Sequence, residues 1–308
     1  MKKILAMLLA LVMVLSLAAC ASTQPAAEPA ASSDAPAESG KTYTVGVCQL
    51  VQHEALDAAT QGFVDALKEA LGDAVTIDVQ NASGDSVNCG TIVNGFVSKG
   101  VDLIMANATP ALTAAVSATA DIPILGTSIT AYGVALDIDD FSGTVGGNVS
   151  GTSDLADLQK QAQMILDWFP ETKTVGLLFC SAEPNSRYQI DEVRKALEAQ
   201  GVTCEEFAFT DSNDVSYTEA IANVLIPAGV PAICGEEGLC RGCGVATLSI
   251  SYYDLGVTTG KMAAKILKGE ANISEMPVEY TDATPKYNAS ICDQLGITPL
   301  DGYEAIDG

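Results

Sequence analysis

The chain is poor in basic residues and contains a single histidine. Of its 308 residues, 15 are Lys or Arg and 39 are Asp or Glu, so the formal net charge at pH 7 is −24. This balance argues against nucleic acid or an anionic lipid surface as the main partner, because binding to either requires patches of Lys and Arg. An acidic surface usually keeps a protein soluble. The positive mean hydropathy, +0.25, excludes a mainly disordered chain.

Sequence motifs of common enzyme classes are also missing. A Ser-His-Asp triad would have to use His53, and no serine lies in a Gly-x-Ser-x-Gly turn. The chain has no Gly-x-x-x-x-Gly-Lys-Ser/Thr loop, no Gly-x-Gly-x-x-Gly after a first strand and no His-Glu-x-x-His. Pairs of carboxylates do not identify a hydrolase here, because 39 acidic residues make chance pairs common. We therefore predict a protein that is not an enzyme and that uses no metal or other cofactor.

No apolar run is long enough to cross a bilayer. The longest extends from Ile4 to Leu17 behind two lysines, which is typical of a secretory signal peptide over residues 1–19. It leads into Leu-Ala-Ala-Cys20, which resembles a bacterial lipobox, so Cys20 would carry a lipid. The remainder of residues 20–40 is mostly Ala, Pro, Ser and acid, as in a disordered tether. We expect an extracytoplasmic protein that is anchored to the membrane through the lipid on Cys20.

The other eight cysteines permit disulfides outside the cytosol. Cys240 and Cys243 form the only Cys-x-x-Cys motif, which fits a redox pair, half of a metal site, a local disulfide or two packed thiols. A metal site is not favoured, because there is no second such motif and His53 is far away in the sequence. A local disulfide or packed thiols is the simpler interpretation. The eight residues are Cys48, Cys89, Cys180, Cys204, Cys234, Cys240, Cys243 and Cys292.

From Thr42 onward, short β-branched runs alternate with amphipathic stretches. Strands separated by helices predict a parallel sheet with right-handed crossovers. The fold class is therefore α/β, with two doubly wound parallel-sheet lobes joined by a multi-strand hinge. In the first half we predict strands at residues 44–47, 75–79, 101–106 and 122–126, and helices at residues 56–71, 86–98 and 111–120. The pattern restarts with helices at residues 155–169 and 187–200 and strands at residues 174–180 and 202–209.

The second half is shorter than the first by about one α-β unit. In the first half about 43 residues separate the end of the second strand from the start of the fourth, enough for a helix, a strand and a helix. In the second half about 21 residues join residue 209 to the strand predicted at residues 230–234, and they hold one helical stretch. We therefore expect the second lobe to lack about one helix and one strand.

A crossover rich in Gly, Ser and Asn at residues 141–154 separates the two halves. We predict a first lobe made of residues 41–148 plus about 253–280, and a second lobe made of residues 149–252 plus about 281–308. The helix predicted at residues 254–268 would return to the first half, so that several strands cross the hinge.

In open α/β sheets, ligands bind beyond the carboxyl ends of the strands, so polar residues in those loops are the candidates. Thr109 and the pair Asn185-Ser186 stand where helices begin, and free backbone N–H groups there attract a carboxylate. Glu236 follows a strand end and is a candidate partner for a ligand ammonium. Structural alternatives are a helix cap for Asn185 and Ser186, a surface acid for Glu236 and a loop residue for His53. The predicted ligand-binding residues are His53, Asn81, Asp85, Thr109, Thr127, Ser128, Thr130, Asn185, Ser186 and Glu236.

Several segments, taken in order, resemble one known family. They include Gln49-Leu-Val-Gln-His53, Asn81-Ala-Ser-Gly-Asp85, Asn148-Val-Ser-Gly-Thr-Ser-Asp154, Glu183-Pro-Asn-Ser186 and Tyr252-Tyr-Asp-Leu-Gly256. The set is similar to the ABC-transporter substrate-binding lipoproteins of the tryptophan/tyrosine-uptake type. The similarity covers nearly everything after the tether, and the order of the segments makes it specific.

The resemblance implies a type I periplasmic-binding-protein fold, whose lobes close around a small amino-acid-like ligand, mostly aromatic in members with known ligands. It also implies an ABC permease and its ATPase as partners. The family normally has a further helix and strand near residues 211–218, so the resemblance and the strand count imply the same deletion. Two alternatives stay open: a surface ligand sensor without a transporter, and a thiol oxidoreductase that uses Cys240 and Cys243.

Overall fold

The computed structural model describes residues 41–210 and 216–306, without the side chains of Ser216 and Tyr217. The predicted signal peptide, Cys20 and the tether therefore lie outside the described residues, and so does most of the segment near residues 211–218. Among the helices of the two described ranges, none combines the length and the apolar character that a bilayer span requires.

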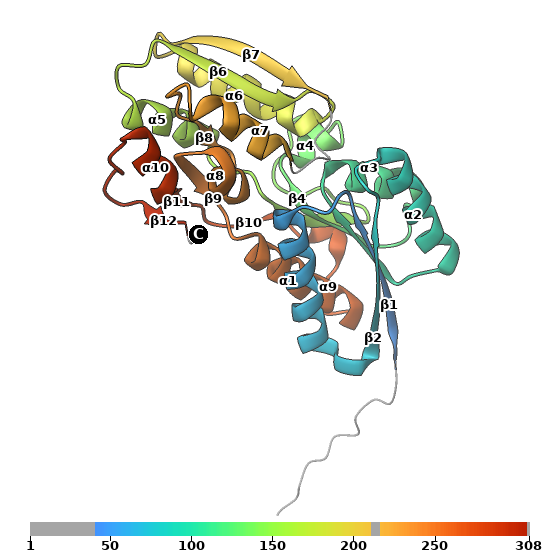
Figure 1. The fold of residues 1–308 in the computed structure, drawn as a ribbon. Helices are drawn as coiled ribbons and strands as arrows, with labels where there is room; N and C mark the ends of the chain where they lie inside the picture. Colours follow the sequence, from blue (N-terminus) through green and yellow to red (C-terminus); the bar gives the residue numbers. More distant parts are fainter. Residues whose placement is uncertain (1–40, 211–215, 307–308) are drawn as a thin grey trace, which may run out of the picture. The chain divides into compact units, whose positions relative to one another are not determined.

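Six strands form the central sheet of the first lobe (Figure 1). Their order is β10-β5-β4-β3-β1-β2, and all neighbouring strands are parallel. The first four strands confirm the sequence prediction to within a few residues at their ends. β3 and β4 are buried along their whole length, as expected for central strands with both faces covered. The strands are β1 (Tyr43–Gln49), β2 (Val75–Asn81), β3 (Leu103–Asn107), β4 (Ile124–Ile129), β5 (Val149–Ser153) and β10 (Glu279–Tyr280).

Two layers of helices cover this sheet. Alternate residues of β3 face the two layers, so that Ile104 packs with α2 and α3 whereas Leu103 packs with α1 and α9. Short helical turns, α4 (Tyr132–Ala135), η1 (Gly72–Ala74) and η2 (Ile273–Glu275), complete the lobe. The main helices are α1 (Glu54–Leu71), α2 (Ser86–Lys99), α3 (Thr109–Ala118) and α9 (Tyr252–Lys268).

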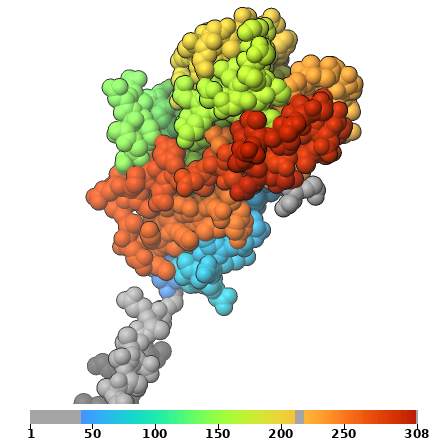
Figure 2. Space-filling model, turned by 90° about the vertical axis from the view of Figure 1, so that its left-hand side faces the viewer, coloured from blue at the N-terminus to red at the C-terminus, as the bar shows by residue number. Residues whose placement is uncertain are grey.

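The late helix α9 packs closely against α1. A Cβ atom at Gly62 would lie 2.1 Å from the carbonyl oxygen of Tyr253, and one at Gly256 would lie 2.0 Å from the carbonyl oxygen of Ala59. Only glycine permits such an approach of two helix backbones. Figures 1 and 2 both show the α9 segment beside α1. The predicted return of a late helix to the first half is confirmed.

The second lobe contains two separate sheets. β6 and β7 form a parallel pair, and the other sheet has the order β12-β11-β9-β8, with β11 antiparallel to β9. The strands are β6 (Thr174–Cys180), β7 (Thr203–Phe209), β8 (Ile233–Cys234), β9 (Ala246–Ser249), β11 (Thr284–Tyr287) and β12 (Glu304–Ala305). The helices are α5 (Leu158–Trp168), α6 (Pro184–Glu198), α7 (Ser216–Leu225), α8 (Glu237–Cys243) and α10 (Ala289–Leu295), of which α8 and α10 are absent from the sequence prediction.

The sheet of the second lobe is interrupted where a strand is expected. In the first lobe β3 lies between β1 and β4, and its equivalent would lie between β6 and β8. Among the described residues, β6 pairs only with β7, and β8 pairs only with β9. Two large apolar side chains of the β6–β7 pair remain on the surface, Leu178 at 47% and Phe207 at 53% exposure. This interruption lies where the sequence predicts the loss of one α-β unit.

β5 differs from the sequence interpretation of residues 141–154 as a crossover. Its Ser, Gly and Thr residues have the composition of a loop, yet it pairs with β4 and β10. Its polar side chains are satisfied inside the lobe: Ser150 Oγ donates to the Met276 carbonyl oxygen at 3.0 Å, and the Thr152 and Thr259 hydroxyl oxygens are 2.8 Å apart. Buried hydrogen bonds thus stabilise a strand that hydrophobic patterning does not reveal.

Candidate functional site

A polar network fixes the start of α1 at the carboxyl ends of β1 and β3. Thr60 Oγ1 donates to Gln49 Oε1 at 2.6 Å, and Gln49 Nε2 donates to Asp57 Oδ1 at 2.5 Å. Asn107 Nδ2 donates to Thr60 Oγ1 at 3.0 Å. Gln49, Asp57 and Thr60 line a pocket of about 300 Å³, to which the predicted ligand residue Asn81 also contributes. The first lobe therefore offers a pre-organised polar surface beyond its strands.

Three predicted ligand-binding residues beyond the carboxyl ends of β1 and β2 accept hydrogen bonds from backbone N–H groups. His53 Nδ1 accepts from the N–H of Ala55 at 3.2 Å and caps α1, and Asp85 Oδ1 accepts from that of Val87 at 2.8 Å and caps α2. Asn81 Oδ1 accepts from the N–H of Ser83 at 2.7 Å. For His53 this agrees with the alternative interpretation as a structural residue of the loop before α1. The second polar atom of each side chain takes no part in these bonds.

Thr127 lies in the interior of the first lobe. Its hydroxyl oxygen is 3.2 Å from that of Thr152, which is 2.8 Å from that of Thr259. Thr259 in turn donates to the Leu255 carbonyl oxygen at 2.9 Å. This chain of buried hydroxyls joins β4, β5 and α9, so Thr127 contributes to the packing of the lobe.

Thr109 and Ser128 lie near the carboxyl ends of the neighbouring strands β3 and β4, where the backbone has unusual geometry. Thr109 begins α3 directly after Ala108, whose φ of 90° turns the chain sharply, and it is almost fully buried. Ser128 has a φ of 55°, and its buried hydroxyl has no hydrogen-bond partner among the described residues. Positive φ at residues other than glycine is strained, and such strain is often found at ligand sites.

Four polar side chains meet at the boundary between the lobes, and we call them the inter-lobe cluster: Thr130, Asp154, Gln189 and Tyr252. Gln189 Nε2 on α6 donates to Thr130 Oγ1, which follows β4, at 3.1 Å. Tyr252 OH at the start of α9 donates to Asp154 Oδ2 at 3.1 Å. The other carboxylate oxygen, Asp154 Oδ1, is buried and has no partner at hydrogen-bond distance in the described part of the chain.

Burial dominates the electrostatics of this cluster. It raises the pKa of Asp154 above its ordinary value, although the hydroxyls of Tyr252 and Thr130 favour the ionised form. Burial also holds the pKa of Tyr252 well above its ordinary value, and the negative charges of Asp154 and Glu236 act in the same direction. A buried carboxylate with an unpaired oxygen is costly unless a cation meets it. The cluster is therefore suited to receive a cationic ligand group.

Neither Asp154 nor Gln189 belongs to the predicted ligand-binding residues, although Thr130 does. Asp154 directly follows β5, so the rule used for the other strand ends would have found it if residues 149–153 had been interpreted as a strand. Gln189 lies inside α6 and carries no comparable signal, because its position depends on how α6 packs against the first lobe.

The predicted residues of the second lobe lie at helix starts. Glu236 accepts from the N–H groups of Gly238, at 2.7 Å, and Leu239, so it caps α8 with both carboxylate oxygens. Ser186 Oγ donates to Glu183 Oε2 at 3.1 Å in the first turn of α6, where Asn185 also lies. Since both oxygens of Glu236 accept from the backbone, Asp154 is the better partner for an ammonium.

A second contact between the lobes runs through Arg241 on α8. Its guanidinium contacts the carboxylate of Glu54, the first residue of α1, and donates to Glu237 Oε1 at 3.0 Å. Lys286 Nζ on β11 lies 2.5 Å from Glu237 Oε2. Through these charges α8 is joined both to the first lobe and to the sheet of its own lobe.

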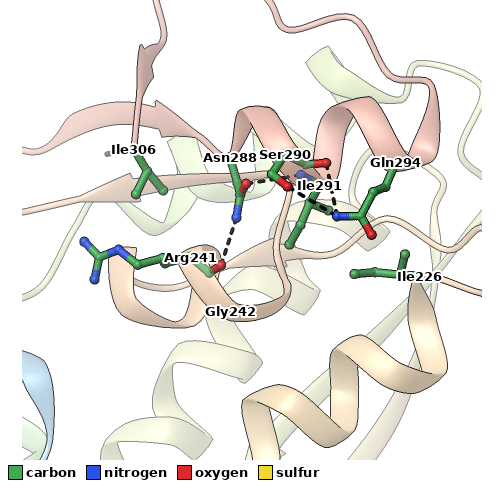
Figure 3. A pocket seen from close by; sticks show the side chains of 8 residues that line it. All are labelled: Ile226, Arg241, Gly242, Asn288, Ser290, Ile291, Gln294 and Ile306. Atoms are coloured by element: carbon green, nitrogen blue, oxygen red, sulfur yellow. Dashed lines mark hydrogen bonds between the residues drawn. The ribbon is translucent and has the colours of Figure 1, made fainter. Parts of the chain in front are cut away.

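A pocket of about 250 Å³ lies within the second lobe (Figure 3). Asn288 Nδ2 donates to the Arg241 carbonyl oxygen at 2.9 Å, and Gln294 Nε2 donates to Ser290 Oγ at 3.3 Å. Its polar side chains are thus bonded to their neighbours. The lining contains none of the predicted ligand-binding residues: it consists of Ile226, Arg241, Gly242, Asn288, Ser290, Ile291, Gln294 and Ile306.

Cys240 and Cys243 form no disulfide with each other. Cys240 and Cys243 are buried on α8, which favours packed thiols over a local disulfide. In residues 41–210 and 216–306 no group of three or more His, Cys, Asp or Glu is arranged to hold a metal ion.

The chain matches a family model described as ABC transporter substrate binding protein over residues 44–226 and 219–302. The two matches overlap at residues 219–226, in α7 and directly after it.

Individual relatives cover almost the whole described chain. A curated tyrosine-binding protein of Clostridioides difficile (strain R20291) is 32% identical over 313 residues, which are 92% of this chain and 89% of the relative. A solved ABC domain from Streptococcus pneumonia in complex with L-Trp is 30% identical, with a TM-score of 0.77 over 86% of this chain and 100% of its own. A ligand-free, open substrate-binding protein with adhesive properties from Clostridium difficile is 31% identical, with a TM-score of 0.68 over 86% and 99% of the two chains. The predicted two-lobed α/β fold is confirmed by these structures.

Proposed function

Because this chain belongs to the family of ABC transporter substrate-binding proteins, we propose that it binds an aromatic amino acid between its two lobes and presents it to an ABC permease. The observation that carries the choice of an amino acid is the buried carboxylate of Asp154 at the lobe boundary, with one unpaired oxygen. A ligand ammonium would neutralise this charge and supply the missing hydrogen bond. The family match gives no support to a thiol oxidoreductase or to a sensor without a transporter.

The ligand carboxylate is assigned to the start of α3. The positive end of the helix dipole favours an anion at this place. Pro110 has no N–H, and the N–H groups of Ala111 and Leu112 donate to the Ala108 carbonyl oxygen, so the backbone donor assigned to the carboxylate is the N–H of Thr109. Thr109 is the first residue of α3, and Ser128, whose hydroxyl has no hydrogen-bond partner among the described residues, lies near the end of the neighbouring strand β4. A carboxylate held here and an ammonium held at Asp154 would orient an amino acid across the carboxyl edge of the first sheet.

The relatives support an aromatic side chain for the ligand. One is named a tyrosine-binding protein and another was solved with L-Trp, at 32% and 30% identity to this chain. In this arrangement Asn185 and Ser186, at the start of α6, approach the ligand from the second lobe. Residues of both lobes then contribute to binding, so that closure and binding are coupled.

The proposed partners are a membrane permease and its cytoplasmic ATPase, with the protein held outside the cytoplasm by a lipid on Cys20. We retain the division into a first lobe that includes about residues 253–280 and a second lobe that includes about residues 281–308. β5 is moved into the first lobe, because it pairs with β4. The hinge then follows residue 153.

Thermal unfolding of the purified mature protein with each of the common L-amino acids tests this function. At a concentration about 100 times Kd, a bound ligand stabilises the native state by about 2.7 kcal/mol. We expect L-tyrosine or L-tryptophan to raise Tm by several degrees, and glycine or L-lysine to leave it unchanged.

Asp154→Asn should abolish most of this rise, because the amide cannot pair with an ammonium. Asp139→Asn is the matched control, since Asp139 is exposed and lies outside the inter-lobe cluster. A full shift in Asp154→Asn, or the absence of any shift in the wild type, would contradict the proposal.

A further inference from the structure

Four exposed lysines lie on the outer side of the helices α1 and α9, and we call them the lysine cluster. The two helices run in the same direction, because Gly256 and Gly260 of α9 approach α1 at positions that are also four residues apart. The second halves of the helices are therefore at the same level. The three lysines on α9 are spaced four and three residues apart, which places them on one face. The cluster consists of Lys68 on α1 and Lys261, Lys265 and Lys268 on α9.

The lysine cluster has no acidic partner, although the chain is strongly acidic. None of its four side chains forms an ion pair with a carboxylate of the described residues, and the same holds for Lys41 before β1. Within residues 41–210 and 216–306, only one further basic residue is unpaired, Lys173 before β6. The other basic residues there all form ion pairs: Lys99, Lys160, Arg187, Arg194, Lys195, Arg241 and Lys286.

The helix dipole explains only part of this arrangement. It favours lysine in the last turn of a helix, as at Lys68 and Lys268. Lys261 lies about two turns before the end of α9, where the dipole has little effect. Lysines three and four residues apart on one helix also repel each other, which destabilises the helix. An external anion at the lysine cluster would relieve this repulsion.

The lysine cluster lies at the end of the first lobe where the described chain begins. α1 leads through η1 into β2, whose first residue Val75 pairs with Tyr43 at the start of β1. Lys41 is therefore at the end of the sheet towards which α1 and α9 run (Figure 1). It directly follows the predicted tether of residues 20–40, and a disordered tether of this length spans about 25 Å. A lipid on Cys20 would thus keep the cluster within reach of a membrane.

We propose that the lysine cluster, together with Lys41, docks the first lobe on the anionic phospholipid headgroups of the membrane that holds its lipid anchor. The proposal rests on the lipid at Cys20 and is independent of which ligand is bound. Ammonium groups attract anionic headgroups over about one Debye length, which is about 8 Å at physiological ionic strength. The tether raises the local concentration of the lobe at the surface, so a weak contact is sufficient. Without the anchor, the acidic remainder of the chain opposes binding to lipid.

The distribution of charge along α1 and α9 also sets the orientation of the docked lobe. The first turns of these helices, at the boundary between the lobes, carry Glu54, Asp57 and Asp254, which an anionic surface repels. The docked lobe is therefore tilted, with the lobe boundary away from the lipid and the proposed ligand site open to solvent. Two exposed acids, Glu69 and Glu270, are near the lysine cluster in the sequence and keep the attraction weak, so that docking is reversible.

The test is lysine footprinting of the lipidated protein in vesicles. The protein is incorporated into vesicles of phosphatidylcholine alone or of equal parts phosphatidylcholine and phosphatidylglycerol, floated on a density gradient and acetylated with an N-hydroxysuccinimide ester. Mass spectrometry gives the rate at each lysine. Acetylation of the lysine cluster should slow by about threefold or more in the anionic vesicles, whereas Lys173 should react equally in both. At about 1 M salt, where the Debye length is about 3 Å, the difference should disappear.

Two charge-matched variants test the assignment to α9. Lys261→Gln with Lys265→Gln should remove most of the protection of Lys68 in anionic vesicles, because the attraction depends on the combined charge. Lys160→Gln with Lys195→Gln removes the same charge from the second lobe and should leave that protection unchanged. Circular dichroism checks that both variants are folded.

Several outcomes would overturn the inference. Equal acetylation rates of the lysine cluster in the two kinds of vesicle would do so, and so would an equal slowing at Lys173. Protection that depends on an added membrane protein would assign the cluster to a protein partner instead of lipid. A protein that floats with neither kind of vesicle would refute the lipid anchor and the docking together, whereas a floating protein with unprotected lysines would refute the docking alone.

Discussion

The two lobes bury their strands to different extents. In the first lobe β1 is buried at six of its seven residues, whereas β6, which holds the corresponding place in the second lobe, is buried at three of seven. The edge strands β2 and β7 are both exposed or half-buried throughout. Both lobes are built from similar sequence patterns, but only the first has a continuous sheet with helices on both faces. The side of β6 that faces away from β7 has no strand partner among the described residues, which leaves β6 less covered than β1. The following predictions test this contrast.

The largest effect is expected for a phenylalanine in the first lobe. Phe63→Ala should destabilise the protein by about 3–5 kcal/mol, because Phe63 is fully buried between α1 and the sheet. Phe207→Ala is the matched variant in the second lobe, where the side chain is 53% exposed, and it should cost below about 1 kcal/mol. Urea unfolding followed by circular dichroism measures both, and equal losses would contradict the contrast.

Two glycine-to-alanine substitutions in the first lobe should change the free energy of unfolding in opposite directions. Gly256→Ala should destabilise by about 1–3 kcal/mol, because the new Cβ would lie 2.0 Å from the Ala59 carbonyl oxygen. Gly90→Ala should stabilise by up to about 1 kcal/mol, because Gly90 lies inside α2 with open space around it. Thermal unfolding of both variants checks the prediction, and a stabilised Gly256→Ala would show that α1 and α9 can separate.

Asp154 predicts a pH dependence at the boundary of the two lobes. Its folded pKa is raised above the ordinary 3.8, so its favourable contribution is present at low pH and is lost as pH rises through the folded pKa. Without ligand, Asp154→Asn should therefore gain stability over the wild type as pH rises from about 3.5 to 7. The nearby Tyr252 and Tyr132 stay neutral in this range, because burial raises their pKa values.

Urea unfolding at a series of pH values measures this difference. A difference that is constant over the range, or that falls as pH rises, would contradict the raised pKa. Saturating L-tyrosine should reverse the order of the two proteins at pH 7, because only the wild type can pair with the ligand ammonium.

The smallest effect is expected for the charged contact between the lobes. Glu54 is 65% exposed in its contact with Arg241, so Glu54→Gln should change the unfolding free energy by less than about 0.5 kcal/mol. A larger change, or one that persists at 1 M salt, would mean that this contact is shielded from solvent. Chemical unfolding at low and high salt measures the effect.

Periodicity predicts most of the first lobe, because β1 and β3 are largely apolar, β2 alternates apolar and polar residues and α1 has one apolar face. It fails for β5, whose polar residues are satisfied by buried hydrogen bonds to segments distant in the sequence, such as Met276. It also fails for α8 and α10, which have seven residues each and too few turns for a clear pattern.

The candidate site is harder to predict, because several of its residues take their roles from contacts with segments distant in the sequence. Residues at strand ends, such as Thr109 and Thr130, follow from topology, and a capping role for His53 follows from its place before α1. Asp154 directly follows β5 and is missed together with that strand. Gln189 acquires its position only when α6 packs against the first lobe, and Glu236 changes from a candidate ligand partner to a helix cap once α8 forms. These roles depend on tertiary contacts, which the local sequence does not reveal.

The packing of α9 on α1 has a consequence for the order of folding. The first lobe buries Phe63 and Leu67 against Met262 and Leu267, so its apolar core stays incomplete until the chain has been made beyond residue 267. Contacts between segments so distant in the sequence require a large loop to close, which slows folding. During synthesis, almost the entire polypeptide must therefore emerge before its N-terminal half can reach a stable state.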